Sequence, residues 1–178
     1  MWYVMQVYTG TEIEICRQCR NRVIKDNEDV FVMLAERMTK IQGEWSLIMS
    51  RLFPGYIFLE TDKIQDFYER LGKVGQTAKI LRTGEEITPL YPEEEEYLRA
   101  VGGDEHIVKY SKGYIEGDKL VVISGAMKNC RGTVKKIMRH KRLVVLEIPL
   151  MGRAVEVTVG MGIVLRDGTG TAVKKVSS

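Results

Sequence analysis

The sequence predicts an α+β protein in which an antiparallel sheet with flanking helices is linked to a small all-β unit. Residues 1–113 alternate strand-like and helix-like patterns, whereas residues 114–178 hold short β-branched stretches separated by glycine-containing turns. The charge changes sign between the two parts: fifteen basic and nineteen acidic residues give the first −4, and twelve basic and five acidic residues give the second +7. We therefore expect two structural units in the 178-residue chain.

The N-terminal part is predicted to begin with a strand and a helix. Residues Trp2 to Val7 are aromatic and β-branched and end at Thr9-Gly10, which is typical of a strand. A helix is predicted from Thr11, because apolar residues recur there near helical spacing and charged residues supply a polar side. The apolar positions are Ile13, Cys16, Val23 and Ile24, and the polar side holds Glu12, Glu14, Arg17, Gln18 and Lys25.

The rest of this part is predicted to hold further strands and two helices. Strands are expected over residues 30–38 and 47–60, with a turn at Gln42-Gly43-Glu44 between them, and a short one over 80–82. Helices are expected over residues 64–71 and from Pro92 onward. Proline at the first helical position and acidic residues in the first turn favour a helix start. The acidic run 93–96 is interpreted as a solvated helix start, with repulsion of nucleic acid as the alternative.

The C-terminal part is predicted to be a small barrel. No apolar period follows Gly102-Gly103-Asp104, so a linker is expected over residues 104–113. Short strands are expected over residues 119–123, 133–138, 143–148 and 154–159, and their even spacing favours a closed barrel over a sandwich. Residues 167–178 are polar and glycine-rich, which predicts a flexible tail.

Composition and motifs disfavour membrane proteins and enzymes. No apolar run approaches the roughly 20 residues that span a bilayer, and three cysteines without a disulfide framework fit a reducing compartment, so we expect a cytoplasmic protein. Cys16 and Cys19 lie inside a helix, which favours core residues over a redox motif. Cys130, His106 and His140 are badly spaced for a metal site. No phosphate-binding loop occurs, and we predict no catalysis, no cofactor and no metal.

An aromatic stretch, Arg51 to Glu60, is the first candidate site. In an extended strand Tyr56 and Phe58 face one way, and Ile57 and Leu59 face the other. Both faces are apolar. If helices cover one face, the other is either covered by another element or left as a docking patch, and the pattern alone leaves both readings open.

A basic cluster in the C-terminal part is the second candidate site. Eight basic residues lie within fifteen positions, and no acid occurs between Asp118 and Glu147. Such a cluster is either a solvated charge run or a surface that binds phosphate. Strand alternation predicts that Lys135 and Lys136 face opposite ways. Residues 139–142 lie where a hairpin turn is expected but include no Gly, Asn or Asp.

Two signatures resemble the NusG family of transcription elongation factors. The stretch Arg51 to Glu60 resembles the strand by which the family's NGN domain binds RNA polymerase, and Gly117 to Val122, with Gly125 and Gly132 behind it, resembles a KOW motif. The resemblance implies an NGN-like domain over residues 1–103 and an SH3-like KOW barrel over residues 114–166. The linker, 104–113, would join them, and the tail, 167–178, would follow.

The resemblance also implies polymerase-binding residues. Phe53, Pro54, Tyr56 and Phe58 match positions that bind the clamp helices of the largest polymerase subunit. Phe67 and Tyr68 fall in the segment that contacts the opposing gate loop in relatives, although an ordinary amphipathic helix explains them equally well. Some relatives carry a further aromatic residue where this chain has Gln6.

The C-terminal part departs from the general members of the family. It is basic where their barrel is acidic, which favours binding to the phosphates of an RNA hairpin. Residues Leu150 to Ala154 match a family segment, but Met151 replaces the phenylalanine that general members offer to ribosomal protein S10 or to Rho, and Met127 and Cys130 replace other phenylalanines. The basic barrel resembles LoaP-type paralogues, which are antiterminators recruited by an RNA hairpin. The predicted RNA-binding residues are Lys128, Arg131, Lys135, Lys136, Arg139, His140, Lys141, Arg142 and Arg153.

These observations predict a specialised elongation factor that acts as a processive antiterminator. Its expected partners are RNA polymerase and a nascent leader RNA hairpin, and it is expected to be a monomer without a membrane partner. One alternative is a general NusG-type factor that binds S10 or Rho through the barrel. Others are a KOW-containing ribosomal or RNA-chaperone protein and, last, a redox enzyme using Cys16 and Cys19.

Overall fold

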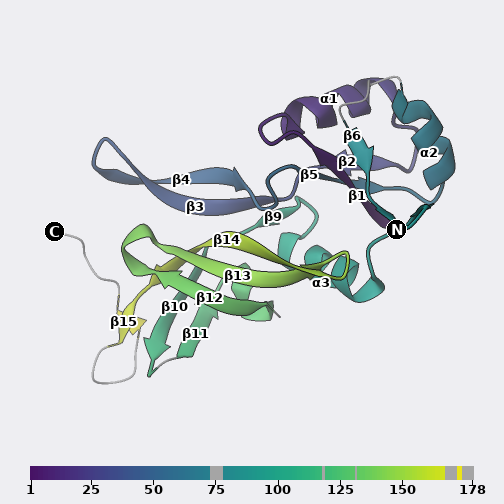
Figure 1. Ribbon diagram of the computed structural model, residues 1–178. Helices are drawn as coiled ribbons and strands as arrows, with labels where there is room; N and C mark the ends of the chain where they lie inside the picture. Colours follow the sequence, from purple (N-terminus) through teal and green to yellow (C-terminus); the bar gives the residue numbers. More distant parts are fainter. Residues whose placement is uncertain (73–77, 118, 131, 167–171, 174–178) are drawn as a thin grey trace.

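The computed structural model describes residues 1–72, 78–117, 119–130, 132–166 and 172–173 (Figure 1). This part of the chain holds three α-helices, a four-stranded sheet, a long hairpin and a curled five-stranded sheet. The helices are α1 (Glu12–Arg22), α2 (Ile64–Leu71) and α3 (Pro92–Gly102). The predicted α+β class is confirmed.

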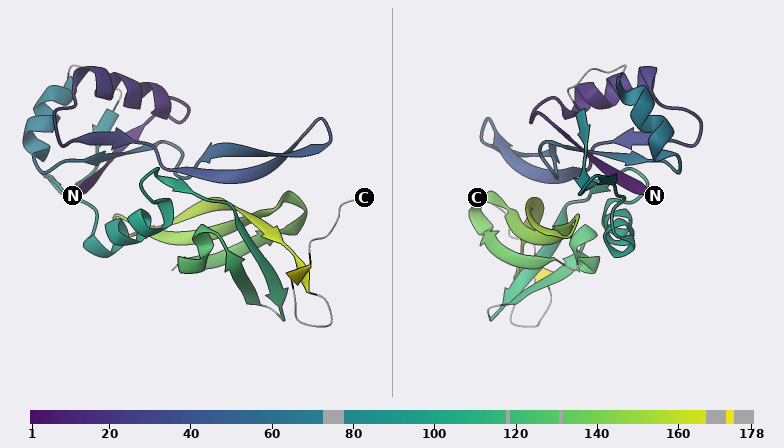
Figure 2. Two further views of the ribbon diagram at one scale, coloured as in Figure 1. Left: turned by 180° about the vertical axis from the view of Figure 1, so that it is seen from behind. Right: turned by 45° about the vertical axis from the view of Figure 1, so that its right-hand side comes forward.

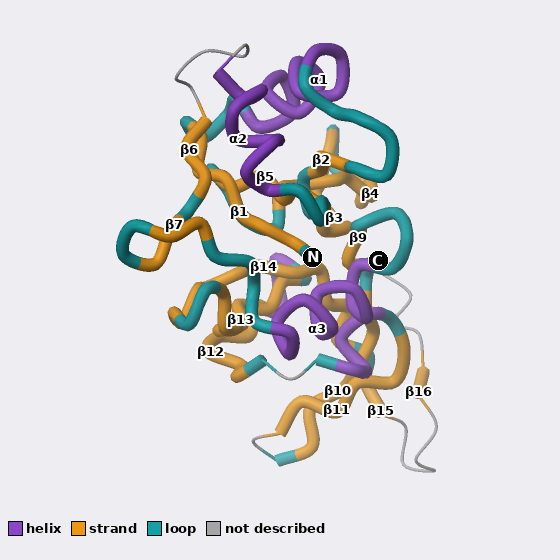
Figure 3. The backbone as a smooth tube through the Cα atoms, turned by 90° about the vertical axis from the view of Figure 1, so that its right-hand side faces the viewer, coloured by secondary structure: helices purple, strands orange, loops and turns teal. Residues whose placement is uncertain are grey.

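The four-stranded sheet has the order β2-β5-β1-β6, and each neighbouring pair is antiparallel. Its strands are β1 (Trp2–Val7), β2 (Asp29–Phe31), β5 (Tyr56–Glu60) and β6 (Ala78–Ile80). Helices α1 and α2 cover one face, which we call the helix face, and α3 lies on the other side of the sheet, toward the curled sheet (Figure 3). We call this other side, which holds Trp2, Val4, Phe31 and Phe58, the second face.

Strand alternation assigns the apolar residues to these two faces as predicted. On the helix face Ile57 and Leu59 of β5 belong to a core cluster with residues of α1 and α2. On the second face Phe58 belongs to a different cluster, which continues into α3 and the C-terminal strands. Tyr56 packs against the same cluster as Phe58. The sheet is therefore buried on both sides.

Helix α1 presents a different side to the sheet than the sequence predicts. Its buried positions are 12, 15, 16 and 19, which have the spacing of one helical stripe. Ile13, predicted to be apolar core, is 53% exposed, whereas Glu12, predicted to be on the polar side, is fully buried. The prediction was wrong at both residues because Glu12 has hydrogen-bond partners that a periodicity argument does not see.

The long hairpin consists of β3 (Leu34–Ile41) and β4 (Glu44–Arg51), which pair over their whole length. Its predicted turn is confirmed: Gln42 and Gly43 have φ values of 51° and 88°, as a type I′ turn requires. The single strands predicted over 30–38 and 47–60 were wrong, since each divides into two. Pro54 lacks an N–H and Gly55 has φ 83°, so the pairing of one strand cannot continue into the next.

The C-terminal part forms a curled five-stranded sheet of order β11-β10-β14-β13-β12. Neighbours are antiparallel except for β10 and β14, which are parallel. The strands are β10 (Ser111–Glu116), β11 (Lys119–Ser124), β12 (Thr133–Met138), β13 (Leu143–Leu150) and β14 (Arg153–Ile163). The predicted closed barrel is corrected to a half-barrel, because no pairing joins β11 to β12 within the described residues.

The linker expected over residues 104–113 is itself part of the sheets. Strand β9 (Ile107–Val108) pairs in parallel with β3, and β10 begins at Ser111. Between them the Tyr110 N–H donates to the Glu36 carboxylate at 2.8 Å. The segment lacked an apolar period because one of its strands is only two residues long. The division into domains stays a prediction.

Smaller elements complete the described part. They are the 3-10 helices η2 (Ala126–Asn129) and η3 (Arg139–Lys141), the pair β7 (Arg82–Thr83) and β8 (Glu86–Ile87), and the pair β15 (Leu165–Arg166) and β16 (Ala172–Val173). Two residues of the expected tail are therefore paired, and its residues 167–171 and 174–178 lie outside the described ones. No helix in the described ranges is long and apolar enough to cross a membrane.

Helix α3 connects the two halves of the molecule. The N-terminal half holds the four-stranded sheet and the long hairpin, and the C-terminal half holds the half-barrel. Toward the sheet, its Glu95 accepts the Trp2 backbone N–H at 2.8 Å. Toward the half-barrel, its Glu94 accepts the backbone N–H groups of Met151 and Gly152 at 2.9 and 3.0 Å. Figure 2 shows the hairpin running from the four-stranded sheet along the half-barrel. The two halves thus share a core as well as a chain connection.

Candidate functional site

The aromatic segment predicted to bind polymerase lies mostly inside the molecule. Phe53 and Phe58 are 2% and 0% exposed, Tyr56 is partly buried and Pro54 is exposed. The Phe53 and Phe58 ring centroids are 5.5 Å apart, and Phe58 stacks on Phe31 at 5.7 Å. Of the two readings left open for this face, the structure has the covered one. The polymerase-binding role of the four residues stays a prediction.

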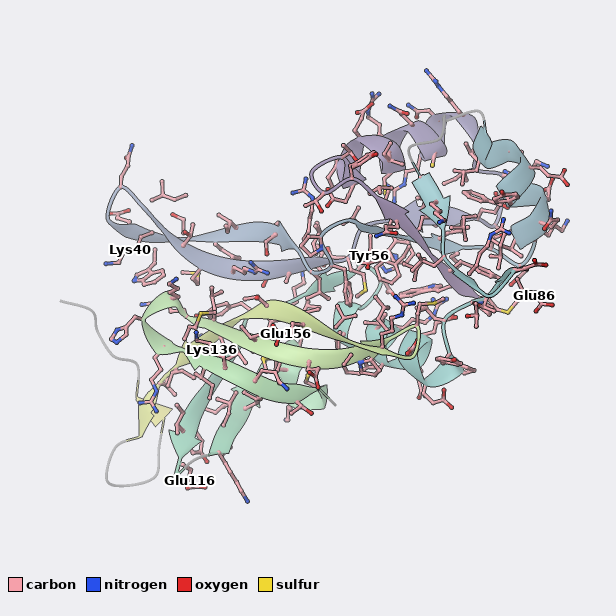
Figure 4. The ribbon with its side chains drawn as sticks, in the orientation of Figure 1. Lys40, Tyr56, Glu86, Glu116, Lys136 and Glu156 are labelled. Carbon is pink, nitrogen blue, oxygen red and sulfur yellow. The ribbon has the colours of Figure 1, made fainter. Side chains whose placement is uncertain are left out.

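The cover of the second face comes from distant parts of the chain. Tyr56 lies between the four-stranded sheet and the C-terminal half (Figure 4). Leu52, which precedes the aromatic residues, borders an apolar cavity of about 20 Å³ together with Tyr97 of α3, Met127 of η2 and Leu146 of β13. Residues from both halves therefore surround the start of the aromatic segment.

A buried carboxylate holds the aromatic segment in place. Glu12 of α1 accepts the backbone N–H groups of Gly55 at 2.8 Å and Gly10 at 2.9 Å, and its Oε2 lies 2.7 Å from Arg51 Nε. Burial alone would raise the pKa of Glu12, but these N–H groups and Arg51 outweigh it and hold the pKa below its ordinary value. Sequence reasoning missed this residue. The only signal in the sequence was a glutamate two residues after Gly10, at the start of the predicted helix.

Helix α2 offers less to a partner than the resemblance implies. Phe67 is fully buried in the helix-face core, since it lies one turn before Leu71 on the side of α2 that meets the sheet. Its predicted contact with the gate loop, like that of Tyr68, stays a prediction. Tyr68 is 41% exposed, and the Arg82 guanidinium lies 5.0 Å from its ring centroid.

The predicted RNA-binding residues separate into two groups at opposite ends of the half-barrel. Lys128 of η2 and Arg153 of β14 lie at the end near α3, and both are exposed. The other end is formed by η3 and its neighbours. We call it the η3 end, and its residues are Lys136, Arg139, His140, Lys141 and Arg142. Strand β13 separates the groups by eight residues, about 25 Å at 3.3 Å per residue. Arg131 lies outside the described residues.

Lys135 belongs to neither group. Its ammonium lies 3.2 Å from Glu147, so its charge is already compensated. The pairing of β12 with β13 shifts between Val134 and Lys136, which makes Lys135 the extra residue of a β-bulge. The strict alternation predicted for Lys135 and Lys136 therefore fails, because a bulge interrupts it.

The turn at the η3 end departs from ordinary hairpin chemistry, as the sequence indicated. Arg139–Lys141 form a 3-10 turn, and Arg142 follows with φ 54°, a left-handed conformation that is uncommon for arginine. Its N–H donates to the Arg139 carbonyl at 3.1 Å, and its own carbonyl accepts the Met161 N–H at 2.9 Å. The conformation is thus fixed by hydrogen bonds on both sides. It leaves Arg139, His140 and Lys141 exposed.

The positions at which this chain departs from general family members face α3. Met127 is 6% exposed, and Met151 packs against the shared core. The Cys130 Sγ lies 3.0 Å from the Tyr97 hydroxyl of α3. The acidic run of α3 also has a structural role that neither reading of it anticipated. Glu94 is 5% exposed and caps the turn between β13 and β14.

The two cysteines of α1 have the environment of core residues. Burial raises the pKa of Cys16 to about 12 and of Cys19 to about 11, so both remain thiols near neutral pH. This environment disfavours the redox reading. Among the described residues, no three His, Cys, Asp or Glu side chains gather in a way that could hold a metal ion.

Comparison with known proteins gives consistent results. The family model described as "Transcription termination factor nusG" matches residues 1–99. Transcription termination/antitermination protein NusG of Campylobacter jejuni is 20% identical over 164 residues, covering 89% of this chain and 92% of its own length. The protein of that name from Thermus thermophilus is 22% identical over 166 residues, covering 85% and 90%. The solved structure "Domain interaction in Thermotoga maritima NusG" is 22% identical, covers 89% of this chain and 92% of its own, and has a TM-score of 0.54.

Proposed function

Because this chain belongs to the NusG family, we propose that it is a specialised transcription elongation factor, a processive antiterminator of the cytoplasm. Its NGN-like part, residues 1–103, binds the clamp helices of the largest subunit of RNA polymerase. Its KOW part, residues 114–166, captures a nascent RNA hairpin. The NusG family consists of transcription factors, and no catalytic step is assigned to the chain.

The observation that carries the RNA-binding half of this proposal is the η3 end. Lys136, Arg139 and Lys141 are exposed, and among the described residues none of them has a carboxylate partner, in contrast to Lys135 with Glu147. Uncompensated lysine and arginine side chains gain affinity for nucleic acid by releasing counterions from phosphates.

The polymerase-binding half of the proposal has a structural condition. Phe53 and Phe58 are buried, so they can contact the clamp helices only after the residues that cover them on the second face move away. In this structure the two halves are in contact, which we call the closed arrangement. Pro54 and Tyr56 reach the surface in the closed arrangement and would be contacted first. Binding of polymerase would therefore favour the separated arrangement of the halves.

Recruitment by RNA follows from effective concentration. A hairpin that has just left the polymerase remains tethered to it, so a factor bound to that hairpin is held near the clamp helices. This raises the local concentration of the factor without any stronger polymerase contact. The factor would then act at operons whose leader RNA carries the hairpin.

The second candidate is a general NusG-type factor that binds S10 or Rho through the KOW part. The names of the relatives favour it, since these proteins are described as transcription termination/antitermination protein NusG. Such a factor would act at all operons without an RNA signal. Against it, Met127 and Met151 stand where general members have phenylalanine, and both pack in the core shared with α3.

The experiment measures transcription through an intrinsic terminator in the presence of the protein. The terminator is placed behind the leader of the operon next to the gene for this protein, and a scrambled leader serves as control. We expect leader-dependent readthrough. The variant Arg139→Gln/Lys141→Gln should lose it, and the log-log salt slope of RNA binding should become shallower by about 1.4 to 1.8. The matched variant Lys128→Gln/Arg153→Gln removes equal charge at the other end and should retain readthrough. Equal readthrough on both leaders would instead support the general factor.

A second pair of variants tests polymerase binding. Tyr56→Ala should lose readthrough and keep RNA binding, because it removes a surface-reaching ring of the aromatic segment. Ile13→Ala removes an exposed apolar side chain elsewhere in the same half and should leave readthrough unchanged. Unchanged readthrough in Tyr56→Ala, with both variants folded by circular dichroism, would refute the polymerase-binding surface.

A further inference from the structure

A tryptophan of the N-terminal half lies against the η3 end. The Arg142 guanidinium carbon is 4.0 Å from the ring centroid of Trp45, and the Lys40 ammonium is 5.7 Å from it. Lys40 and Trp45 are directly opposite each other in the hairpin, where they share one face. Figure 4 shows Lys40 of the hairpin and Lys136 of the half-barrel at the same end of the molecule. One indole ring thus has cations from both halves beside it.

The hairpin is fixed on the half-barrel by specific contacts. The Arg37 guanidinium donates to the Thr158 carbonyl of β14 at 2.7 Å, and Glu36 accepts the Tyr110 N–H at 2.8 Å. A Cβ at Gly160 would lie 2.3 Å from the Glu36 carbonyl oxygen, so any other residue there would push the hairpin away. Trp45 therefore stands beside Arg142 because both backbones are held there.

Resting on the proposed function, we propose that the RNA-binding surface is composite: Trp45 and Lys40 of the N-terminal hairpin form it together with the η3 end. A partly exposed indole offers a face on which an unpaired base can stack, and the neighbouring cations contact the phosphates on either side of that base. Single-stranded loops of RNA hairpins present such unstacked bases. The ligand class is therefore a hairpin loop rather than a duplex stem.

The charges around Trp45 agree with this assignment. Lys40, Arg139 and Lys141 are exposed, as is Glu44 of the hairpin turn. Glu44 pairs with Ile41, one position away from the Lys40–Trp45 pair, so alternation places its carboxylate on the opposite face of the hairpin. The hairpin thus places Lys40, and not Glu44, beside the indole ring.

The composite surface couples RNA binding to the arrangement of the halves. Because its parts come from both halves, it exists only while the hairpin rests on β14. RNA that binds it must therefore stabilise this arrangement by its binding free energy. In contrast, contact of Phe53 and Phe58 with polymerase requires the second face to be uncovered. The RNA hairpin and the clamp helices are thus expected to weaken each other's binding, and capture of polymerase would release the loop base from Trp45.

The test is equilibrium binding of the full chain to RNA transcribed from the leader of the neighbouring operon, with a scrambled RNA of equal length as control. Trp45→Ala should weaken leader binding by about 5- to 160-fold, the range that loss of one stacked base covers, and leave the salt slope unchanged. Lys40→Gln should make the slope shallower by about 0.7 to 0.9. Trp45→Phe, which keeps an aromatic face, should recover most of the affinity.

A double-mutant cycle separates stacking on RNA from a role in holding Arg142. If Trp45 only positions the Arg142 guanidinium, Trp45→Ala will not weaken leader RNA binding further in a protein that already carries Arg142→Gln. That result would overturn the proposal. If Trp45 stacks on a base, its effect will persist there. Acrylamide quenching gives a direct readout, because of the two tryptophans Trp2 is fully buried and Trp45 is not. Bound leader RNA should protect Trp45.

The outcomes distinguish this inference from the proposed function. Loss of leader binding in Arg139→Gln/Lys141→Gln together with unchanged binding, within twofold, in Trp45→Ala would overturn the composite surface and leave the proposed function standing. Unchanged leader binding in both variants would overturn both. Protection of Trp45 by a protein partner of transcription but not by RNA would also overturn the composite RNA surface.

Discussion

The two faces of the four-stranded sheet differ in what covers them. The helix face is covered by α1 and α2, which follow β1 and β5 directly along the chain. The second face is covered by α3 and the C-terminal half, which lie much further along the chain. The difference indicates which of the two covering layers is expected to separate from the sheet. Separation of a distant segment would leave the sheet and its own two helices in place, so we expect the second face, rather than the helix face, to become accessible to a partner.

The largest expected effect comes from a core residue of α3. Leu98→Ala, at a side chain with no exposed area, should lower the free energy of unfolding by about 2 to 5 kcal/mol. Leu71→Ala, at a 4% exposed side chain of α2, should cost a similar amount on the helix face. Only Leu98→Ala should also speed amide hydrogen exchange in β13 and β14, because only α3 belongs to their core. Urea unfolding and hydrogen exchange measure both quantities.

The outcome that contradicts the comparison is specific. If Leu71→Ala speeds exchange in β13 and β14 as much as Leu98→Ala does, the two faces belong to a single cooperative unit. The second face could then not be uncovered without unfolding the sheet, and the distinction between local and distant cover would have no functional meaning.

The next effect in size concerns a buried carboxylate between α3 and the half-barrel. Glu94→Ala leaves the N–H groups of Met151 and Gly152 without their acceptor and should cost about 2 to 3 kcal/mol of unfolding free energy. Glu93→Ala, at the exposed neighbouring position, should cost less than about 0.5 kcal/mol. Equal effects of the two substitutions in thermal or urea unfolding would show that Glu94 contributes only charge at the helix start.

A smaller effect should appear as a pH dependence of the second face. The His106 ring stacks on Phe31 at a centroid distance of 3.6 Å, and burial lowers its pKa. Its Nδ1 is buried and has no hydrogen-bond partner among the residues that the structure describes. The charged groups that face it are Asp29 and Glu60, which raise its pKa, and Arg99 and Arg20, which lower it.

The sign of the pH dependence follows from this lowered pKa. The folded protein favours neutral His106, so its contribution is fully present above the unfolded pKa of about 6.5 and is lost as the pH falls below that value. As the pH falls, the unfolding free energy should decrease by at most about 1.4 kcal/mol per pH unit, the limit for one proton. His106→Asn, which tolerates the residue's φ of 55°, should flatten the profile between pH 7.5 and 5.5. An unchanged slope would assign the dependence to another group.

Much of the fold could be predicted from the sequence because its signals are local. Strand alternation assigned Ile57 and Phe58 to opposite faces, Pro92 marked the start of α3, and Gln42-Gly43 marked a turn. The division of residues 47–60 into β4 and β5 was missed because both pieces are apolar, although Pro54-Gly55 marks a break between them in the sequence itself. The two-residue strand β9 was too short to leave a pattern at all.

The candidate sites were less predictable because they depend on distant contacts. The sequence marked the aromatic segment but could not show that α3 and the half-barrel bury Phe53 and Phe58. It grouped Lys128 with Arg139, whereas β13 holds them at opposite ends. Trp45 was missed because an isolated tryptophan in a strand has no motif. Its proximity to Arg142 exists only after the hairpin folds onto β14.

The smallest perturbation uses the three cysteines as reporters of the two faces. Cys16 and Cys19 lie in the helix-face core, and Cys130 packs against the core that α3 shares with the half-barrel. If the second face opens while the helix face stays closed, a thiol reagent at pH 8 should modify Cys130 at least about tenfold faster than Cys16 or Cys19. The raised pKa values of Cys16 and Cys19 slow their modification further, since little thiolate is present at these two residues.

Single-cysteine variants with alanine at the other two positions would give each rate, and Leu98→Ala should increase only the rate of Cys130. Partial exposure of Cys130 in the closed arrangement also speeds its reaction, so the decisive quantity is the response to Leu98→Ala. A rate for Cys130 that does not change would mean that the second face opens no more readily when α3 packs poorly. The buried rings of Phe53 and Phe58 would then remain out of reach of the clamp helices.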